Sequence, residues 1–187
     1  MKVLVMIGSR NHDGQTAKVA NAYIEGLKDG DAAVEHVYLP EMKINRCLQC
    51  NKDGWGTCLS DGKCCQTDDF SSLVDKVRAA DAVVFATPVY WGDLSESLKA
   101  FLDRLRRICT SKEEGRNGIR GKTAVGIAVA GGGGGGSLNC IENLQRTCDH
   151  MGINVVDMIP SRRQNLDLKI EVARLSGKWL ALQRAQG

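Results

Sequence analysis

Three loops in this sequence combine glycine with polar or aromatic side chains in patterns that suit ligand binding. The first runs from Gly8 to Thr16, between an apolar run and an amphipathic segment. Backbone N–H groups at a helix start attract anions, and glycine lets the chain approach a phosphate closely. The pattern is neither the G-x-G-x-x-G of dinucleotide sites nor the G-x-x-x-x-G-K of triphosphate sites. It suits a monophosphate, and an ordinary capped turn explains it equally well.

The second loop runs from Thr87 to Asp93 and carries two adjacent aromatic residues, Tyr90 and Trp91. Flat amphipathic rings at a loop offer a surface for a flat heterocycle. The alternative is that both rings fill the space between a helix and the sheet. The chain has only three Trp, three Tyr and three Phe, so two together at a predicted ligand edge favour the binding role.

The third loop is a run of consecutive glycines, Gly131–Gly136, followed by Ser137. Ordering so many glycines is entropically costly, and such runs are usually flexible linkers. Here the run joins a buried strand to an amphipathic helix, where a linker has no purpose. We therefore expect its N–H groups to lie against a planar polar group. Such N–H dipoles would stabilise a reduced flavin, which carries negative charge near its N1–O2 edge.

A cluster of cysteines offers a second kind of chemistry. Cys47 and Cys50 form a C-x-x-C pair, and Cys58, Cys64 and Cys65 follow. Four thiolates at such spacing could hold a zinc ion or an iron–sulfur cluster. One spaced pair with scattered followers is weaker than two paired motifs, so we favour no metal; a redox-active thiol pair is a further option.

The remaining cysteines and the histidines suggest no site. Cys109, Cys140 and Cys148 lie on predicted helices, where a buried free cysteine acts as a small hydrophobic residue. The histidines do not cluster in the sequence, so a histidine metal site or a histidine-centred triad has no support. They are His12, His36 and His150.

Short apolar runs alternate with amphipathic segments along the chain, which predicts strands alternating with helices. Asp68 is expected to cap the helix that follows it. The expected strands are Val3–Ile7, Ala33–Leu39, Asp81–Ala86, Thr123–Ala130 and Ile153–Ile159. Besides the helix after Asp68, the expected helices are Gln15–Leu27, Leu94–Ile108, Leu138–His150 and Leu166–Gln183.

This alternation predicts the α/β class: a doubly wound, five-stranded parallel sheet with strand order 2-1-3-4-5. We expect one domain over residues 1–187, with a cysteine-containing insertion at about 41–67. In such a fold the three loops leave the carboxyl ends of neighbouring strands beside the switch point, where ligands bind. Their joint placement is a stronger indication than any one loop.

Composition restricts the class of partner. The formal net charge is +3 and no lysine–arginine block occurs, so nothing suggests nucleic acid or an anionic membrane. No apolar stretch approaches the roughly 20 residues needed to cross a bilayer, and the N-terminal run has no signal-peptide features. We expect a cytoplasmic protein.

Motifs in these loops and in the helix after the second loop resemble those of the NADPH-dependent FMN reductase family, which includes flavodoxin-like oxidoreductases and iron–sulfur flavoproteins. The resemblance covers Lys2 to about Ile159. The motifs are Gly8-Ser9, Gly14-Gln15-Thr16, Thr87-Pro88-Val89-Tyr90-Trp91-Gly92 and Leu98-Lys99-Ala100-Phe101-Leu102-Asp103-Arg104.

The resemblance implies specific roles. Many members carry an arginine at the position of Asn11, whereas here the arginine is Arg10. The helix residues Lys99, Phe101, Asp103 and Arg104 are expected to serve packing and surface ion pairing. The implied phosphate ligands are Ser9, Arg10, Asn11, Gly14, Gln15 and Thr16. The isoalloxazine would contact Pro88, Val89, Tyr90, Trp91 and Gly92, and its pyrimidine side Gly131, Gly132, Gly133 and Gly136.

The resemblance implies an enzyme that uses FMN to pass electrons from NADH or NADPH to a quinone, nitro compound, flavin or metal ion. No side-chain acid or base is needed, since the cofactor does the chemistry. One alternative is an iron–sulfur electron carrier using Cys47, Cys50, Cys58 and Cys64, although Asp53 stands where the compact motif has its third cysteine. Another is a non-enzymatic zinc-knuckle module.

The resemblance also implies a homodimer or homotetramer. The segment that we expect to reach a neighbouring subunit is the insertion, Glu41–Thr67.

Overall fold

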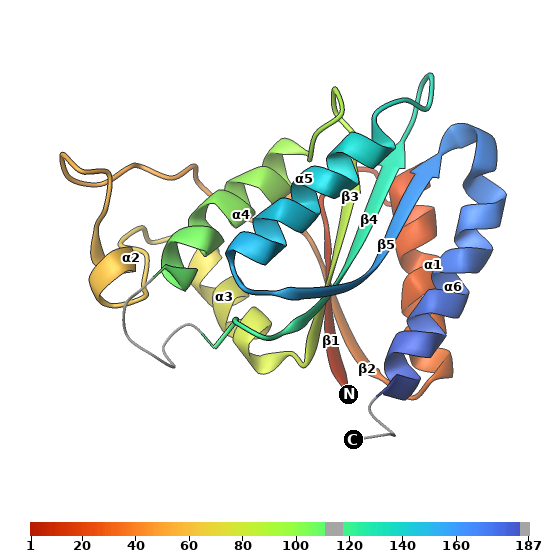
Figure 1. Cartoon of the computed structure of the whole chain (residues 1–187), viewed down its shortest axis with the longest axis horizontal. Coiled ribbons are helices and arrows are strands. Elements are labelled where there is room, and N and C mark those ends of the chain that lie inside the picture. The colour runs from red at the N-terminus through yellow and green to blue at the C-terminus, as the bar shows by residue number, and fades with distance from the viewer. Residues whose placement is uncertain (111–117, 184–187) are drawn as a thin grey trace.

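The computed structural model describes residues 1–110 and 118–183. Its centre is a parallel sheet with strand order β2-β1-β3-β4-β5 (Figure 1). This is the flavodoxin-like order, as predicted. The strands are β1 (Lys2–Ile7), β2 (Ala33–Tyr38), β3 (Ala82–Pro88), β4 (Thr123–Ala130) and β5 (Asn154–Arg162).

Helices cover both faces of the sheet (Figure 1). One face carries α1 (Gln15–Asp29) and α6 (Leu166–Leu182), and the other carries α3 (Phe70–Ala79), α4 (Glu96–Cys109) and α5 (Ser137–His150). Three short elements complete the described part: η1 (Leu39–Glu41), α2 (Thr57–Ser60) and η2 (Arg163–Asn165). No described helix is both long enough and apolar enough to cross a bilayer.

The alternation of side chains along β1 divides the interior into two cores. Val3, Val5 and Ile7 pack under α1 and α6, whereas Leu4 and Met6 pack under α3, α4 and α5. Successive strand residues point to opposite faces, so a strand buried on both sides must be apolar throughout. That requirement explains the unbroken apolar runs from which the strands were predicted.

The predicted elements are confirmed, and their ends differ by a few residues. The largest difference lies in β5, which was expected to end at Ile159 but continues through Pro160 to Arg162. β5 is an edge strand, where proline is tolerated because its missing N–H can fall on the unpaired side. Cys109, Cys140 and Cys148 are buried, as predicted, and burial raises the pKa of each thiol to about 12.

Glycine allows α1 and α6 to approach closely. A Cβ at Gly26 would lie 1.9 Å from the backbone oxygen of Arg174, and one at Gly177 would lie 2.3 Å from that of Tyr23. Real Cβ atoms do not approach backbone so closely, so both positions need glycine for packing rather than for a turn. The close contact fixes α6 against α1 along the side of the molecule.

We expect Gly177→Ala to destabilise the protein by about 1–3 kcal/mol through overpacking, although alanine alone favours a helix by about 1 kcal/mol. Urea unfolding measures the change. Gly133→Ala is the matched control, because a Cβ there meets nothing within 4 Å; it should change the free energy of unfolding by less than about 0.5 kcal/mol. Equal stability of Gly177→Ala and the parent would contradict the close approach.

Candidate functional site

A cavity of about 1180 Å³ opens where the loops after β1, β3 and β4 meet at the carboxyl edge of the sheet. In Figure 1 the last two loops stand at the top of the view. The cavity exceeds the roughly 300–1,000 Å³ of typical small-molecule sites. The predicted residues that line it are Ser9, Gln15, Thr16, Pro88, Val89, Tyr90, Trp91, Gly92, Gly131, Gly132, Gly133 and Gly136.

Three of the predicted residues do not line the cavity. Arg10 is exposed and its guanidinium pairs with Glu96, 3.2 Å away. Asn11 instead shapes the loop, since its side-chain oxygen accepts the N–H of Asp13 at 2.9 Å and its backbone oxygen accepts that of Gly14 at 3.3 Å. These two residues therefore hold the first loop in place, and Gly14 leads into α1.

The N-terminus of α1 is left without a protein cap. Its N-cap residue, Gly14, provides no side-chain hydrogen bond, and the first turn has no acidic residue. The first N–H groups of a helix lack partners within the helix, and the helix dipole adds partial positive charge. Ser9 and Thr16 are largely buried at this end and line the cavity. The arrangement suits an anion held by backbone amides and hydroxyls.

A buried polar atom at the same place also lacks a partner. The side-chain oxygen Oε1 of Gln15 is buried and accepts no hydrogen bond within the described residues, and Gln15 lines the cavity. Leaving such an atom unpaired costs roughly 1–3 kcal/mol. A ligand with a hydrogen-bond donor at this position would remove that cost.

The second loop is a tight turn that projects its aromatic residue outward. Tyr90 and Asp93 exchange two backbone hydrogen bonds, of 2.9 and 3.0 Å. Between them Trp91 and Gly92 both have positive φ, 52° and 80°, as in a type I′ turn. The Trp91 side chain is fully exposed and Tyr90 is half exposed. Neither ring fills the space between helix and sheet, so the core-packing alternative is wrong for these two residues.

The glycines of the third loop divide into two groups. Gly132, Gly134 and Gly136 have positive φ values of 42°, 77° and 83°, a conformation that glycine adopts without strain. The intervening glycines, Gly131, Gly133 and Gly135, do not, and a Cβ on any of them would meet nothing within 4 Å. The chain itself gives no reason for glycine at these positions. A ligand lying against the backbone supplies one.

The third loop ends at a second uncapped helix. Gly136 is the N-cap of α5 and gives no side-chain hydrogen bond, and the first turn has no acidic residue. A Cβ at Gly136 would lie 2.8 Å from the Cα of Gly92, so the second and third loops touch. Asp93, Asn139 and Asn143 also line the cavity and were missed. The asparagines are four residues apart, which places both on one helix face.

A sequence profile described as "NADPH-dependent FMN reductase" matches residues 1–161. The chain belongs to this family.

Individual relatives agree with that assignment. An iron-sulfur flavoprotein of Methanocaldococcus jannaschii is 29% identical, over 97% of this chain and 96% of that protein. One from Archaeoglobus fulgidus is 36% identical over 56% of this chain, but the match spans only 46% of that protein. The solved structure of an NAD(P)H:quinone oxidoreductase from Methanothermobacter marburgensis has a TM-score of 0.70 at 19% identity, covering 96% of each chain. This last likeness concerns the fold.

The cavity fits the cofactor for which this FMN reductase family is named. FMN has a phosphate at one end and a flat ring system at the other. The uncapped α1 suits the phosphate, and the unpaired oxygen of Gln15 marks an incomplete hydrogen-bond network. Gly131, Gly133 and Gly135, whose backbone conformations do not require glycine, leave space for a flat ring.

The insertion of this FMN reductase family member forms a separate small pocket. Five cysteines line a space of about 20 Å³ together with Arg104 and Arg107 of α4. The Sγ atoms of Cys50 and Cys65 lie 3.5 Å apart. The hydrogen bond with Cys50 raises the pKa of the Cys65 thiol, and either sulfur can be the donor of the pair.

The five thiols line one pocket but are not drawn together around a common centre. Within the described residues, no three His, Cys, Asp or Glu side chains are grouped as metal ligands. The Sγ of Cys64 accepts a hydrogen bond of 3.2 Å from Arg104. Asp53, at the third position of the compact motif, accepts the N–H of Trp55 at 3.0 Å.

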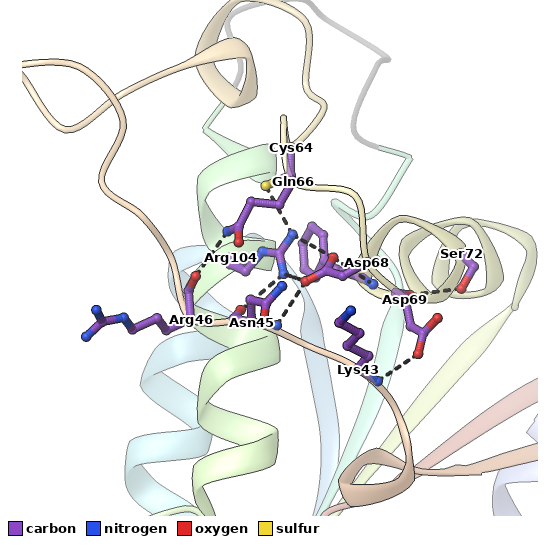
Figure 2. A network of polar contacts seen from close by, with 10 residues as sticks. Lys43, Asn45, Arg46, Cys64, Gln66, Asp68, Asp69, Ser72 and Arg104 are labelled. Atoms are coloured by element: carbon purple, nitrogen blue, oxygen red, sulfur yellow. Dashed lines mark hydrogen bonds and ion pairs between the residues drawn. The ribbon is translucent and has the colours of Figure 1, made fainter.

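Arg104 fastens the insertion to α4 (Figure 2). Its guanidinium makes bonds of 2.6 and 3.0 Å to both carboxylate oxygens of Asp68 and one of 3.1 Å to the backbone oxygen of Asn45. It also stacks on Phe70, 4.1 Å from the ring centre. The expectation of a surface ion pair for Arg104 is wrong, since both partners are almost fully buried. Asp69 holds the N-cap position of α3 without a side-chain bond, and the expected capping by Asp68 is confirmed, since its Oδ1 accepts the N–H of Phe70 at 3.3 Å.

The Arg104–Asp68 pair makes the stability of the fold depend on pH in the acid range. Burial raises the pKa of Asp68, but the hydrogen bonds and charge of Arg104 outweigh this, and the net pKa lies below its ordinary value. A depressed pKa stabilises the fold above the unfolded-state pKa of about 3.9. That contribution is lost as the pH falls from there through the folded-state pKa.

We expect Asp68→Asn to cost about 3–5 kcal/mol at pH 7, because it leaves Arg104 buried without its counter-charge. Urea unfolding at pH 7 and between pH 4 and 3 measures this. The variant should lose less stability than the parent across the acid range. Asp103→Asn, which removes an exposed pair with Lys99, is the control and should cost less than about 1 kcal/mol. If the free energy of unfolding fell equally in Asp68→Asn and the parent as the pH is lowered from 4 to 3, the Asp68 carboxylate would be ruled out as the cause.

The cysteine geometry predicts which thiols oxidise together. Diamide removes one hydrogen atom from each of two thiols and joins their sulfurs, and we expect it to link Cys50 with Cys65 because these Sγ atoms are already adjacent. Peptide mapping by mass spectrometry identifies the bond. Cys65→Ser should abolish it and Cys58→Ser should leave it. A bond between Cys47 and Cys50 in the parent would contradict the observed pairing.

Proposed function

We propose that this chain is an FMN-dependent NAD(P)H oxidoreductase that reduces a small acceptor, such as a quinone, a nitro compound, free flavin or a metal ion. The observation that carries the proposal is the meeting of two uncapped helix N-termini and the glycines of the third loop at one cavity. Solved relatives of the same fold include an NAD(P)H:quinone oxidoreductase, which supports a quinone among the acceptors.

Neutral groups hold the phosphate in this proposal. Ser9, Gln15 and Thr16 line the cavity beside the N-terminus of α1. Among the described lining residues Asp93 is the only charged one, so no arginine or lysine stands ready to pair with the phosphate. Backbone N–H groups and the helix dipole therefore supply the attraction. Arg10, which pairs with Glu96, is left out of the phosphate site.

The ring lies between the second and third loops. Tyr90 and Trp91 offer aromatic surface on one side, and Gly131, Gly133 and Gly135 leave the other side free of side chains. The uncapped N-terminus of α5 adds partial positive charge at the same place. Fixed dipoles of this kind stabilise negative charge that develops on a bound group.

FMN, when bound, supplies hydride acceptance and onward electron transfer. The chain positions the ring, provides the dipoles and leaves one side of the site open for the nicotinamide and then the acceptor. The size of the cavity allows two molecules to meet there. No side chain needs to exchange a proton in the hydride step.

The direct test is anaerobic reduction of the FMN-loaded protein. We expect NADPH or NADH to bleach the flavin absorbance, and a quinone to restore it. Loaded protein that neither nucleotide reduces would contradict the proposed activity.

A glycine variant tests the proposed ring position. Gly133→Val should lower FMN affinity by about tenfold or more, because its side chain would occupy the space assigned to the ring, while thermal stability stays unchanged. The control is Gly121→Asn in the turn before β4, at the opposite edge of the sheet. A Cβ there also meets nothing within 4 Å, and asparagine tolerates its positive φ. Unchanged FMN affinity in Gly133→Val would place the ring elsewhere.

A further inference from the structure

Helix α6 carries apolar residues on two opposite faces. The inner set, spaced alternately four and three residues apart, packs toward α1 and the sheet: Leu166, Ile170, Ala173, Gly177 and Leu180. A second set has the same spacing, shifted by two residues: Leu168, Val172, Leu175, Trp179 and Leu182. At about 100° per residue, a two-residue shift turns the second set to the far side of the helix. We call this second set the outer seam.

The outer seam is open to solvent within the described structure. Leu168 is 63% exposed, Leu175 69%, Trp179 44% and Leu182 51%. Beside it, Val156 of the edge strand β5 is 37% exposed. Val156, Val172, Leu175 and Trp179, with Asp157 and Ser176, line a groove of about 430 Å³. Figure 1 shows α6 along the outer side of the molecule, where a partner could reach it. A continuous exposed apolar strip of this kind marks an interaction site.

We propose that the outer seam binds the same helix of a second copy of this chain, with the two α6 helices antiparallel. A 4-3-4-3 spacing is the a and d pattern by which two helices pack along their length. The proposal is independent of the function proposed above, since none of the outer-seam residues lines the large cavity.

The charges beside the seam select the partner and its direction. Glu171 and Lys178 flank the seam on one side, seven residues apart. Glu171 lies near enough to Arg174 to help raise the pKa of that guanidinium, whose ion pair is with Asp29. Two helices that pack antiparallel bring equivalent flanking positions together. Glu171 then faces Lys178 of the partner subunit, and the two-fold axis repeats this pair.

A parallel arrangement lacks this match. In parallel helices, a residue that flanks the seam on one side meets the residue five positions later in the partner, which flanks the seam on the other side. Glu171 would then face Ser176 of the partner subunit. Lys178 would face Gln183 of the partner subunit. Neither is an ion pair, and the antiparallel arrangement is therefore favoured.

The antiparallel arrangement also matches the sizes of the apolar residues. Val172 lies opposite Leu175 of the partner subunit at the centre, and Leu168 lies opposite Trp179 of the partner subunit toward each end. The largest residue of the seam thus meets a leucine instead of another tryptophan. The same patch serves both subunits, as a two-fold interface requires.

Analytical ultracentrifugation of the full chain, over a concentration series around 10 μM, tests the proposal at its centre. We expect a dimer for the parent and a monomer for Leu175→Glu, with the dissociation constant raised about 100-fold or more. The comparison variant is Leu48→Glu: Leu48 is 60% exposed and lies in the insertion, the segment that the sequence led us to expect at a subunit contact and that the present proposal leaves outside the interface. It should leave the dimer intact. A parent that stays monomeric, or a dimer that Leu48→Glu breaks and Leu175→Glu does not, would overturn the proposal.

A charge swap tests the antiparallel pairing without removing apolar surface. Glu171→Lys and Lys178→Glu each place like charges opposite one another twice, and each should raise the dissociation constant about tenfold. The double variant restores opposite charges and should return to within about threefold of the parent at low salt. A double variant as weak as the single ones would exclude the antiparallel pair. Circular dichroism confirms that each variant is folded.

Discussion

The site depends on one constraint: backbone N–H groups at the starts of α1 and α5 have no acceptor supplied by their own helix or by a capping side chain. A parallel sheet puts the carboxyl ends of all its strands at one edge, so the loops that precede these helices open into the same space. The chain fills neither helix start with a carboxylate. Glycine also stands at positions 131, 133 and 135, where the packing of the chain leaves room for a side chain. In the function that we propose, the cofactor accepts hydrogen bonds from these donors, which the fold leaves without acceptors.

Helix α4 lies between these two helices in sequence and has a different role. Ser95 caps it, accepting the N–H of Leu98 at 3.5 Å, and Glu96 lies in its first turn. Its N-terminus is therefore satisfied by the chain itself. Farther along, Arg104 holds Asp68 and Asn45, and Arg107 donates to the backbone of Gly54 at 2.8 Å and stacks on Trp55. The helix anchors the insertion, whose small size and short elements offer little apolar core of their own.

Local pattern was enough to predict the strands, the helices and the three loops, because buried parallel strands require apolar runs and tight loops require glycine. Most of the binding residues predicted from that pattern line one cavity. Local pattern failed where long-range contacts decide. Asp68 was predicted only to cap α3; its carboxylate does accept the N–H of Phe70, but it also binds Arg104, 36 residues away, which the sequence did not indicate. Arg10 follows Ser9 as a phosphate ligand would, but Glu96 draws it outward, and no local pattern contains that information.

The central claim is that α1 holds a phosphate, and comparing FMN with riboflavin tests it most directly, since the two differ only in that group. Quenching of flavin fluorescence during titration gives both dissociation constants. The account predicts that FMN binds in the micromolar range or tighter, and riboflavin at least about 100-fold more weakly, a difference of about 2.7 kcal/mol. Equal affinities, or no binding of FMN, would contradict it.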